Sequence, residues 1–113
     1  MFKTLQLTIQ KKQDGIYTKT YRYFLNDLKK MQYEINNDNE SDLKGFNYIS
    51  GGNQKELYIF FISPSTEYLQ TVKKLVNQRL KAIAEKNQEH NIYKFTEGRV
   101  IDYYDNKRNY SFY

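Results

Sequence analysis

The chain of 113 residues contains no cysteine and no tryptophan, and it has one proline and one histidine. The absence of cysteine excludes disulfides and thiolate metal sites, and it predicts a reducing compartment such as the cytoplasm. The single histidine, His90, cannot form a typical structural zinc site without cysteine partners, and it cannot supply the histidine pair of a rolling-circle nickase. We therefore expect no metal and no cofactor.

Long hydrophobic runs are also absent. The longest, Leu57–Ile62, is far shorter than the roughly 20 residues that a membrane-spanning helix needs. The first residues, MFKTLQLTIQKK, alternate apolar and polar side chains and lack the apolar centre of a signal peptide. These features predict a cytoplasmic protein that does not contact a membrane.

The length and the even composition predict one domain that spans residues 1–113. There is no internal repeat and no Pro- or Ser-rich linker. A chain of this size buries roughly two-thirds of the surface that its unfolded form exposes, so a single core suffices without staples.

The net charge of +5 is unevenly distributed. Residues 1–33 carry seven Lys or Arg against two acids, residues 34–42 carry four acids and no base, and residues 43–113 carry eleven bases against seven acids. A basic protein with one short acidic stretch favours a polyanionic partner such as nucleic acid. Many small cytosolic domains of similar charge bind none, so the charge alone does not decide.

Hydrophobic periodicity predicts strands and two helices. Residues 4–10 alternate with period two, and residues 16–24 fit either a second strand, after a turn at Asp14-Gly15, or the start of a helix. Leu25, Leu28, Met31 and Ile35 then follow at helical spacing.

The second half predicts a strand around 46–49, a turn at 51–53 and a strand over 56–63 that is apolar on both faces. A second helix should begin with Ser63 as its N-cap, carry its apolar stripe from Leu69 to Ile83, and end near Asn87. Three short strands follow, over 92–96, 99–104 and 108–113. This order predicts an α+β fold with a compact, barrel-like, mostly antiparallel sheet and two helices.

Tyrosine, arginine and lysine alternate at the end of the chain, RVIDYYDNKRNYSFY. Single-stranded RNA binds to such surfaces, because bases stack on aromatic rings while Lys and Arg contact phosphates. Tyrosine is also an ordinary strand residue that covers a core. On the second helix, Lys73, Asn77 and Lys81 recur every four residues and would form either a phosphate-contacting row or a solvated face. The predicted stacking residues are Tyr103, Tyr110 and Tyr21, and the predicted phosphate contacts are Arg99, Lys107, Arg108, Lys73 and Lys81.

Three segments, FKTLQLTIQKK, GGNQKELYIFFISP and EGRVIDYYDNKRNYSFY, together with the order of elements, resemble the small PUA-like RNA-binding proteins carried on conjugative plasmids of Gram-positive bacteria. The resemblance implies a PUA-like fold and an RNA-binding regulator that acts post-transcriptionally on a mobile-element operon. It implies no catalytic residue. The RNA-recognition motif is a poorer match, because its glycine-bearing RNP1 pattern is absent.

Two other functions stay open. The chain resembles RelE-like ribonuclease toxins in being small, basic and rich in Tyr, Arg and Lys, and Arg99 or Arg108 would then stabilise the phosphorane while Tyr110 or Lys107 transfers protons. That family begins with a strand and a helical hairpin, which is a different order. The third reading is a protein-binding accessory factor of a phage or plasmid that docks a basic partner on its acidic stretch, Glu34–Asp42. A homodimer is likewise left open.

Overall fold

The computed structural model describes residues 2–13, 18–38, 45–51 and 55–102. In chain order its elements are β1 (Lys3–Lys11), α1 (Thr20–Asn36), β2 (Gly45–Gly51), β3 (Glu56–Ser63), α2 (Thr66–Lys86), β4 (Tyr93–Glu97) and β5 (Ile101–Asp102). In this part of the chain, neither helix is long and apolar enough to cross a membrane.

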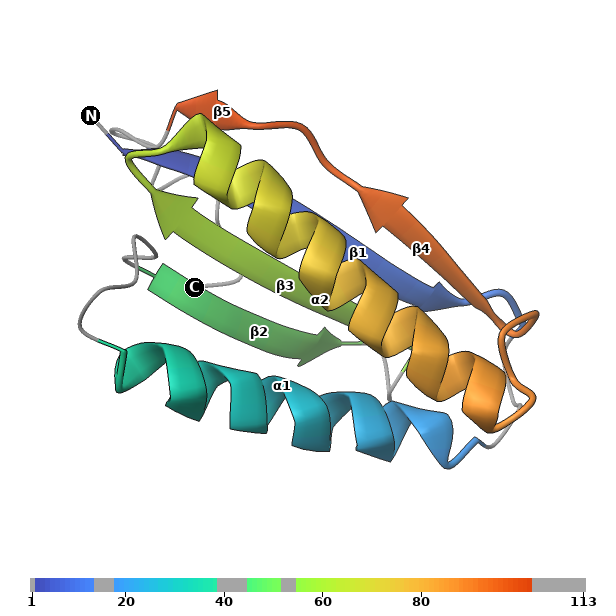
Figure 1. The fold of residues 1–113 in the computed structure, drawn as a ribbon. Helices are drawn as coiled ribbons and strands as arrows, with labels where there is room; N and C mark the ends of the chain where they lie inside the picture. The colour runs from blue at the N-terminus through green and yellow to red at the C-terminus, as the bar shows by residue number, and fades with distance from the viewer. Residues whose placement is uncertain (1, 14–17, 39–44, 52–54, 103–113) are drawn as a thin grey trace.

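The strands form one antiparallel sheet in the order β2-β3-β1-β4, and β5 pairs with β1 beyond the end of β4 (Figure 1). The sheet contains two split β-α-β units: β3 lies between β1 and β2, and β1 lies between β3 and β4. This is the ferredoxin-like arrangement.

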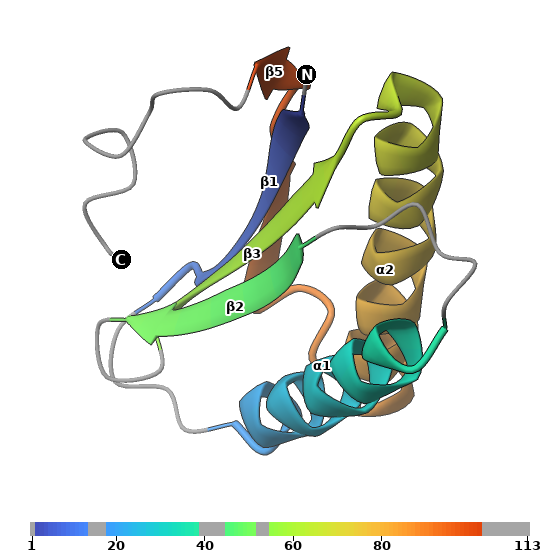
Figure 2. The ribbon, with the colours of Figure 1, turned by 90° about the vertical axis from the view of Figure 1, so that its left-hand side faces the viewer.

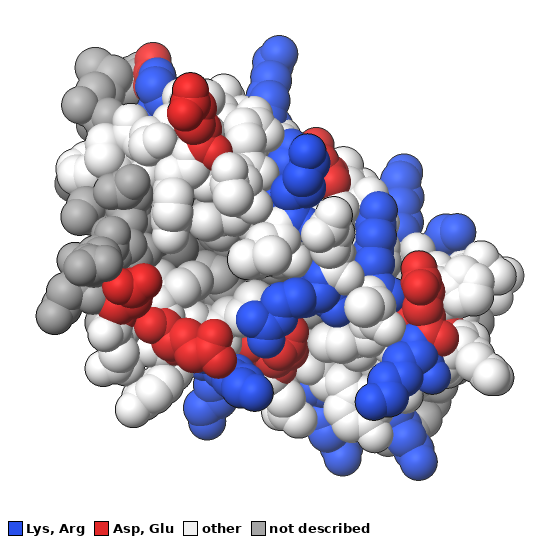
Figure 3. Space-filling model, viewed as in Figure 1, with Lys and Arg blue, Asp and Glu red and all other residues white. Residues whose placement is uncertain are grey.

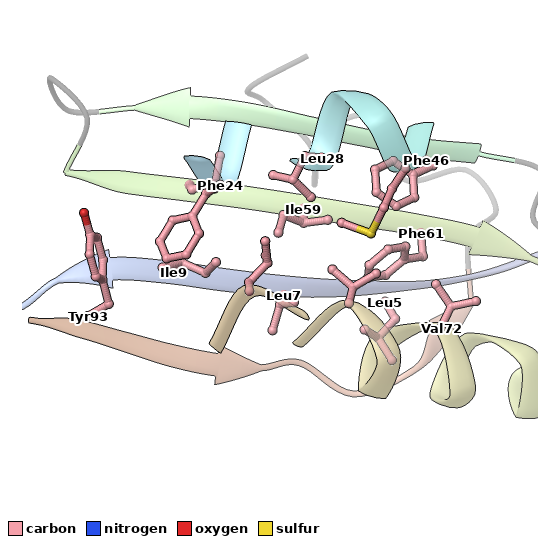
Figure 4. Packing of buried hydrophobic residues seen from close by; sticks show 14 of the residues in the cluster. Leu5, Leu7, Ile9, Phe24, Leu28, Phe46, Ile59, Phe61, Val72 and Tyr93 are labelled. Carbon is pink, nitrogen blue, oxygen red and sulfur yellow. The ribbon is translucent and has the colours of Figure 1, made fainter. Parts of the chain in front are cut away.

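Both helices cover the same face of the sheet (Figure 2). Alternate residues of the central strands face them, among them Leu5, Leu7 and Ile9 of β1 and Ile59 and Phe61 of β3, and all are at most 1% exposed. Figure 4 shows these side chains packed against residues from α1, β2 and α2. The core therefore lies between the helices and one face of the sheet.

The expectation of a barrel-like, PUA-like fold is wrong, although the α+β class and the two helices are confirmed. Within the described residues β2 and β4 end the strand order and do not pair with each other, so the sheet is open. The reason is that each helix carries the chain across the sheet to a strand two places away. Local hairpins alone, which the sequence favoured, could have closed the sheet.

Residues 20–24 belong to α1, which settles the ambiguity over that segment in favour of a helix. Its N-cap residue, Lys19, makes no side-chain cap. Instead, the backbone N–H and the hydroxyl of Thr20 both donate to Glu89 Oε1, the first at 3.3 Å. A carboxylate at a helix N-terminus satisfies unpaired N–H groups and complements the helix dipole. The capping residue, Glu89, lies 69 residues after Thr20 in the chain. The sequence around residue 20 therefore contains no local signal for the start of the helix.

The second helix begins two residues later than expected. Ser65, and not Ser63, is the N-cap, and its side chain accepts from the N–H of Tyr68 at 3.1 Å. Ser63 is the buried last residue of β3, and its Oγ accepts from the N–H of Ser65 at 3.1 Å. The predicted end near Asn87 is confirmed.

Gln88 follows the C-cap of α2 with a positive φ of 59°. The N–H of Gln88 donates to the carbonyl of Glu85 at 2.9 Å, and the N–H of Glu89 donates to the carbonyl of Ala84 at 2.8 Å. These two bonds form a Schellman motif, which normally places glycine at this position. The motif turns the chain so that Glu89 reaches the start of α1.

A one-residue bulge separates β4 from β5. Leu7 pairs with Glu97 and Thr4 pairs with Ile101, so the β4–β5 strand has one residue more than β1 over this interval. A Cβ added to Gly98 would lie 2.7 Å from the carbonyl oxygen of Gln6, so this position requires glycine. The bulge leaves Val100 packed against the core and Ile101 44% exposed on the other face. The predicted strand at 108–113 lies outside the described residues.

Candidate nucleic-acid interface

Four of the predicted interface residues, Tyr103, Lys107, Arg108 and Tyr110, lie outside the described residues and stay predictions. Tyr21 is described, and it lies in the core with an exposed fraction of 2%. Its hydroxyl bonds with Ser50 Oγ and donates to the carbonyl of Glu56 at 3.0 Å, and burial raises the pKa of this phenol. The ring of Tyr21 therefore offers no face on which a base could stack.

The predicted row on α2 faces β4. Lys73 Nζ lies 3.1 Å from Glu97 Oε1, and the buried Asn77 donates to Glu97 Oε2 at 2.6 Å. Lys81 Nζ lies 5.7 Å from the centre of the Phe95 ring, a cation–π geometry. Because Lys73 and Asn77 hold Glu97, they join the helix to the sheet instead of forming an open track for phosphates.

Arg79, also on α2, is bound to α1. Its Nε and Nη2 donate to the two carboxylate oxygens of Asp27 at 3.1 and 2.5 Å. A bidentate pair of this kind is among the stronger side-chain interactions and fixes geometry as well as energy. It locks the two helices together on the outer side of the core.

The outer face of α1 carries cations of a different kind. Arg22, Lys29 and Lys30 are exposed, and no ion pair or hydrogen bond of their side chains is found among the described residues. Tyr23 and Tyr33, on the same helix, are 42% and 70% exposed. We call this surface the α1 face, made of Lys19, Arg22, Tyr23, Asn26, Lys29, Lys30 and Tyr33.

Helical geometry brings the α1 face together. Residues three, four and seven apart share a side of a helix, which joins Tyr23, Asn26, Lys30 and Tyr33 in one stripe. Interpreting residues 16–24 as a strand groups Tyr17, Lys19, Tyr21 and Tyr23 instead, which hides the stripe. From Tyr23 onward the spacing was visible in the sequence, and the missing signal was the helix start. In Figure 3, Lys and Arg side chains are spread over this side of the molecule, with Asp and Glu side chains between them.

The helix-free face of the sheet differs in character. Proteins of the RNA-recognition type stack bases on aromatic residues of a four-stranded sheet. Here Tyr58 and Phe60 of β3 point to this side, but Phe60 is 1% exposed and Tyr58 is half-buried. Of the described β1, β2 and β3 residues that point this way, Glu56 is the only charged one. β4 adds Lys94, which pairs in register with Gln10 and points the same way. Among the described residues, this face therefore carries fewer cations than α1 does.

Two hollows mark the described surface of α2. One, of about 330 Å³, is lined by Gln70, Thr71, Lys73, Lys74, Leu75 and Gln78. The other, of about 250 Å³, contains Lys81, Glu85, His90, Tyr93 and Phe95. Tyr93 bonds with Thr18, and burial raises the pKa of its phenol. His90 is exposed, and among the described residues no hydrogen bond joins it to Glu85. Among the described residues no group of three His, Asp or Glu could hold a metal ion.

Comparison of the sequence with protein-family models gives no match, and comparison with curated proteins gives none. Among solved structures, the chain is similar to a dimeric ferredoxin-like protein from an uncultured marine organism, with 13% identity and a TM-score of 0.48, over 91% of this chain and 90% of that one.

Proposed function

We propose that this protein binds single-stranded RNA on the α1 face and acts as a non-enzymatic, post-transcriptional regulator. The observation that carries the proposal is a set of three exposed cations, Arg22, Lys29 and Lys30, on the same helix as two exposed tyrosines, Tyr23 and Tyr33. None of the three cations has an ion pair among the described residues. Cations that have no internal partner are available to phosphates, and exposed rings are available to bases.

The dimensions suit a short stretch of RNA. Tyr23 and Tyr33 are ten residues apart, which corresponds to about 15 Å along a helix. Lys29 and Lys30 lie between them, and the Asn26 amide can both donate to and accept from base edges. Each tyrosine would stack on one base, with a contribution of roughly 1–3 kcal/mol per base, and the cations would contact the phosphates between the two bases.

The platform is rigid on its buried side. Phe24 and Leu28 are fully buried, and the Phe24 ring meets the Tyr93 and Phe95 rings edge to face, with centroids 5.1 and 6.1 Å away. Asp27 is held by Arg79. Binding would therefore order only the exposed side chains, which lowers its entropic cost. Arg99 lies between β4 and β5, at the edge of the sheet opposite α1, so it does not extend the α1 face. The contacts predicted for Tyr103, Lys107, Arg108 and Tyr110 lie outside the described residues and stay predictions.

The test is fluorescence anisotropy with a single-stranded and a hairpin RNA pool, at about 50 and 200 mM salt. We expect binding that weakens with salt, and intact RNA on a gel afterwards. The α1 triple variant (Arg22→Gln, Lys29→Gln, Lys30→Gln) should bind more weakly and lower the salt slope by about 2, at roughly 0.7 per phosphate contact.

Three results would overturn the proposal. Shortened RNA would favour the RelE-like ribonuclease. An absence of binding at low salt would show that the protein does not bind these RNAs. If Tyr58→Ala lost RNA binding while the α1 triple variant kept it, the interface would lie on the helix-free face of the sheet.

A further inference from the structure

The two edges of the sheet differ in how their backbone groups are satisfied. At the β2 edge, Gln32 Nε2 of α1 donates to the carbonyl of Phe46 at 2.7 Å, so a side chain of α1 caps an outward backbone group. Figure 1 shows α1 running beside β2, whereas neither described helix runs outside β4. Unpaired edges bind other chains unless something covers them.

The register identifies which β4 groups point outward. The N–H of Lys12 donates to the carbonyl of Ile92, and the N–H of Gly98 donates to the carbonyl of Gln6, both at 2.8 Å. Because hydrogen-bonding direction alternates along a strand, even-numbered residues of β4 face β1. The N–H and C=O groups of Tyr93, Phe95 and Glu97 therefore point away from the sheet, and in the described chain no hydrogen bond reaches them.

Positive side chains surround this edge. Lys94 and Arg99 are exposed and have no ion-pair partner among the described residues, and Lys81 lies over the Phe95 ring. The one acid on the strand, Glu97, is already held by Lys73 and Asn77. We call the outward backbone of Tyr93, Phe95 and Glu97, with Lys81, Lys94 and Arg99 beside it, the β4 edge.

We propose that the β4 edge binds an extended acidic segment of a partner protein by strand addition. Three N–H and three C=O groups would pair with the backbone of the incoming strand, which is the general mode of β-augmentation. Alternate side chains of that strand would lie on the α2 side, near Lys81, and on the opposite side, near Lys94. Carboxylates on both sides therefore match the charge of the edge.

A second copy of this chain fits the edge less well. Antiparallel pairing of β4 with its own copy would place two sets of Lys81 and Lys94 along one short interface, and like charges across strands destabilise pairing. The same lysines that oppose self-association attract an acidic strand. The proposal does not depend on RNA binding, because the α1 face and the β4 edge share no residue.

The first probe is a fluorescein-labelled, acetylated and amidated peptide of nine residues, Glu-Glu-Val-Val-Glu-Glu-Val-Val-Glu, in which both faces of the strand carry carboxylates. One control peptide has Lys in place of Glu, and the other has the acidic sequence with alternate backbone nitrogens methylated. We expect the acidic peptide to bind in an anisotropy titration. Both controls should bind at least about tenfold more weakly, since two lost hydrogen bonds or reversed charges remove that much affinity.

Amide hydrogen exchange supplies a second readout. The N–H groups of Tyr93, Phe95 and Glu97 should exchange rapidly in the protein alone and become protected when the acidic peptide is added. The N–H groups of Lys94 and Thr96 already face β1 and should change little. Lys94→Glu should weaken peptide binding about tenfold, whereas the matched Lys30→Glu change on α1 should leave it unaltered.

Three outcomes would overturn the inference. Equal binding of the methylated peptide would reduce the interaction to charge alone. Protection of the outward amides that rises with protein concentration, without peptide, would assign the edge to a second copy. An absence of binding to the acidic peptide would show that the lysines only protect the edge. The α1 triple variant should bind the peptide normally, so failure here leaves the RNA proposal intact.

Discussion

The two helices are both basic, and they use their cations differently. On α2, Lys73 pairs with Glu97, Arg79 pairs with Asp27, and Lys81 lies over Phe95. On α1, Arg22, Lys29 and Lys30 are exposed and have no such partners in the described part of the chain. Net charge is therefore a poor guide to a binding surface. Lys74 and Lys86 on α2 are also exposed and have no ion pair among the described residues, so the α1 face is distinguished by such cations together with the exposed rings of Tyr23 and Tyr33.

The tyrosines of the α1 face should give the largest effect of any pair of substitutions. Tyr23→Ala with Tyr33→Ala should reduce RNA affinity by roughly 1–3 kcal/mol for each lost stack. The free energy of unfolding should change by less than about 0.5 kcal/mol, because Tyr23 and Tyr33 are exposed and not part of the core. Anisotropy and urea unfolding measure the two quantities. A fall in stability that matches the fall in affinity would mean that these rings support the fold.

Arginines on the two helices should behave in opposite ways. Arg79→Gln should lower the free energy of unfolding by about 1–3 kcal/mol, because it leaves the half-buried Asp27 without its bidentate partner. Arg22→Gln should change it by less than about 0.5 kcal/mol. Urea denaturation of the two variants compares them directly. Equal losses of unfolding free energy in the two variants would contradict the distinction between cations that form internal ion pairs and cations that are free to bind RNA.

The turn after α2 positions Glu89 against the start of α1, and a substitution in this turn should stabilise the fold. Gln88→Gly should raise the free energy of unfolding by about 1 kcal/mol, because a left-handed conformation costs a non-glycine residue roughly 1–2 kcal/mol. RNA affinity should not change, since the α1 face is untouched. Thermal unfolding with a parallel anisotropy titration tests both statements, and a destabilised variant would show that the Gln88 side chain makes a needed contact.

Alkaline pH should act on the buried tyrosines. Burial raises the pKa of Tyr21 and Tyr93 above 10.0, so the folded state holds their protons more tightly than the unfolded state. Their contribution to stability is then complete below about pH 10 and is lost as pH rises through the raised pKa values. Urea midpoints from pH 8 to 11 should fall only at the upper end, and less steeply in Tyr21→Phe. A midpoint that rises with pH would contradict this assignment.

Most elements of the fold could be predicted from the sequence, and their arrangement could not. Alternation identified β1 and the apolar run identified β3, because both patterns are local. The strand order depends on the two helical crossovers, β1-α1-β2 and β3-α2-β4, which pack against the sheet. Local sequence patterns do not indicate which strands such crossovers bring together. The start of α1 was hidden for a related reason: its cap, Glu89, lies in the loop after α2.

The candidate site was only partly predictable. The composition indicated the kinds of side chain involved, aromatic rings beside cations. It could not indicate where on the surface the site lies, because that depends on which cations form internal ion pairs. Lys73 looked available in the sequence and is bound to Glu97 in the structure. Lys29 and Lys30 were present in the sequence and were not selected, because the start of α1 was not assigned and Tyr23 could equally belong to a strand.

The most direct measurement compares two variants of equal net charge. The α1 triple variant is titrated with the single-stranded RNA pool beside an α2 triple variant (Lys74→Gln, Lys81→Gln, Lys86→Gln), at about 50 mM salt. Our account predicts that the α1 triple variant loses most of its affinity and that the α2 triple variant stays close to the unmodified protein. Equal losses would show that net charge alone drives binding, and a larger loss on α2 would contradict the assignment of the interface to α1.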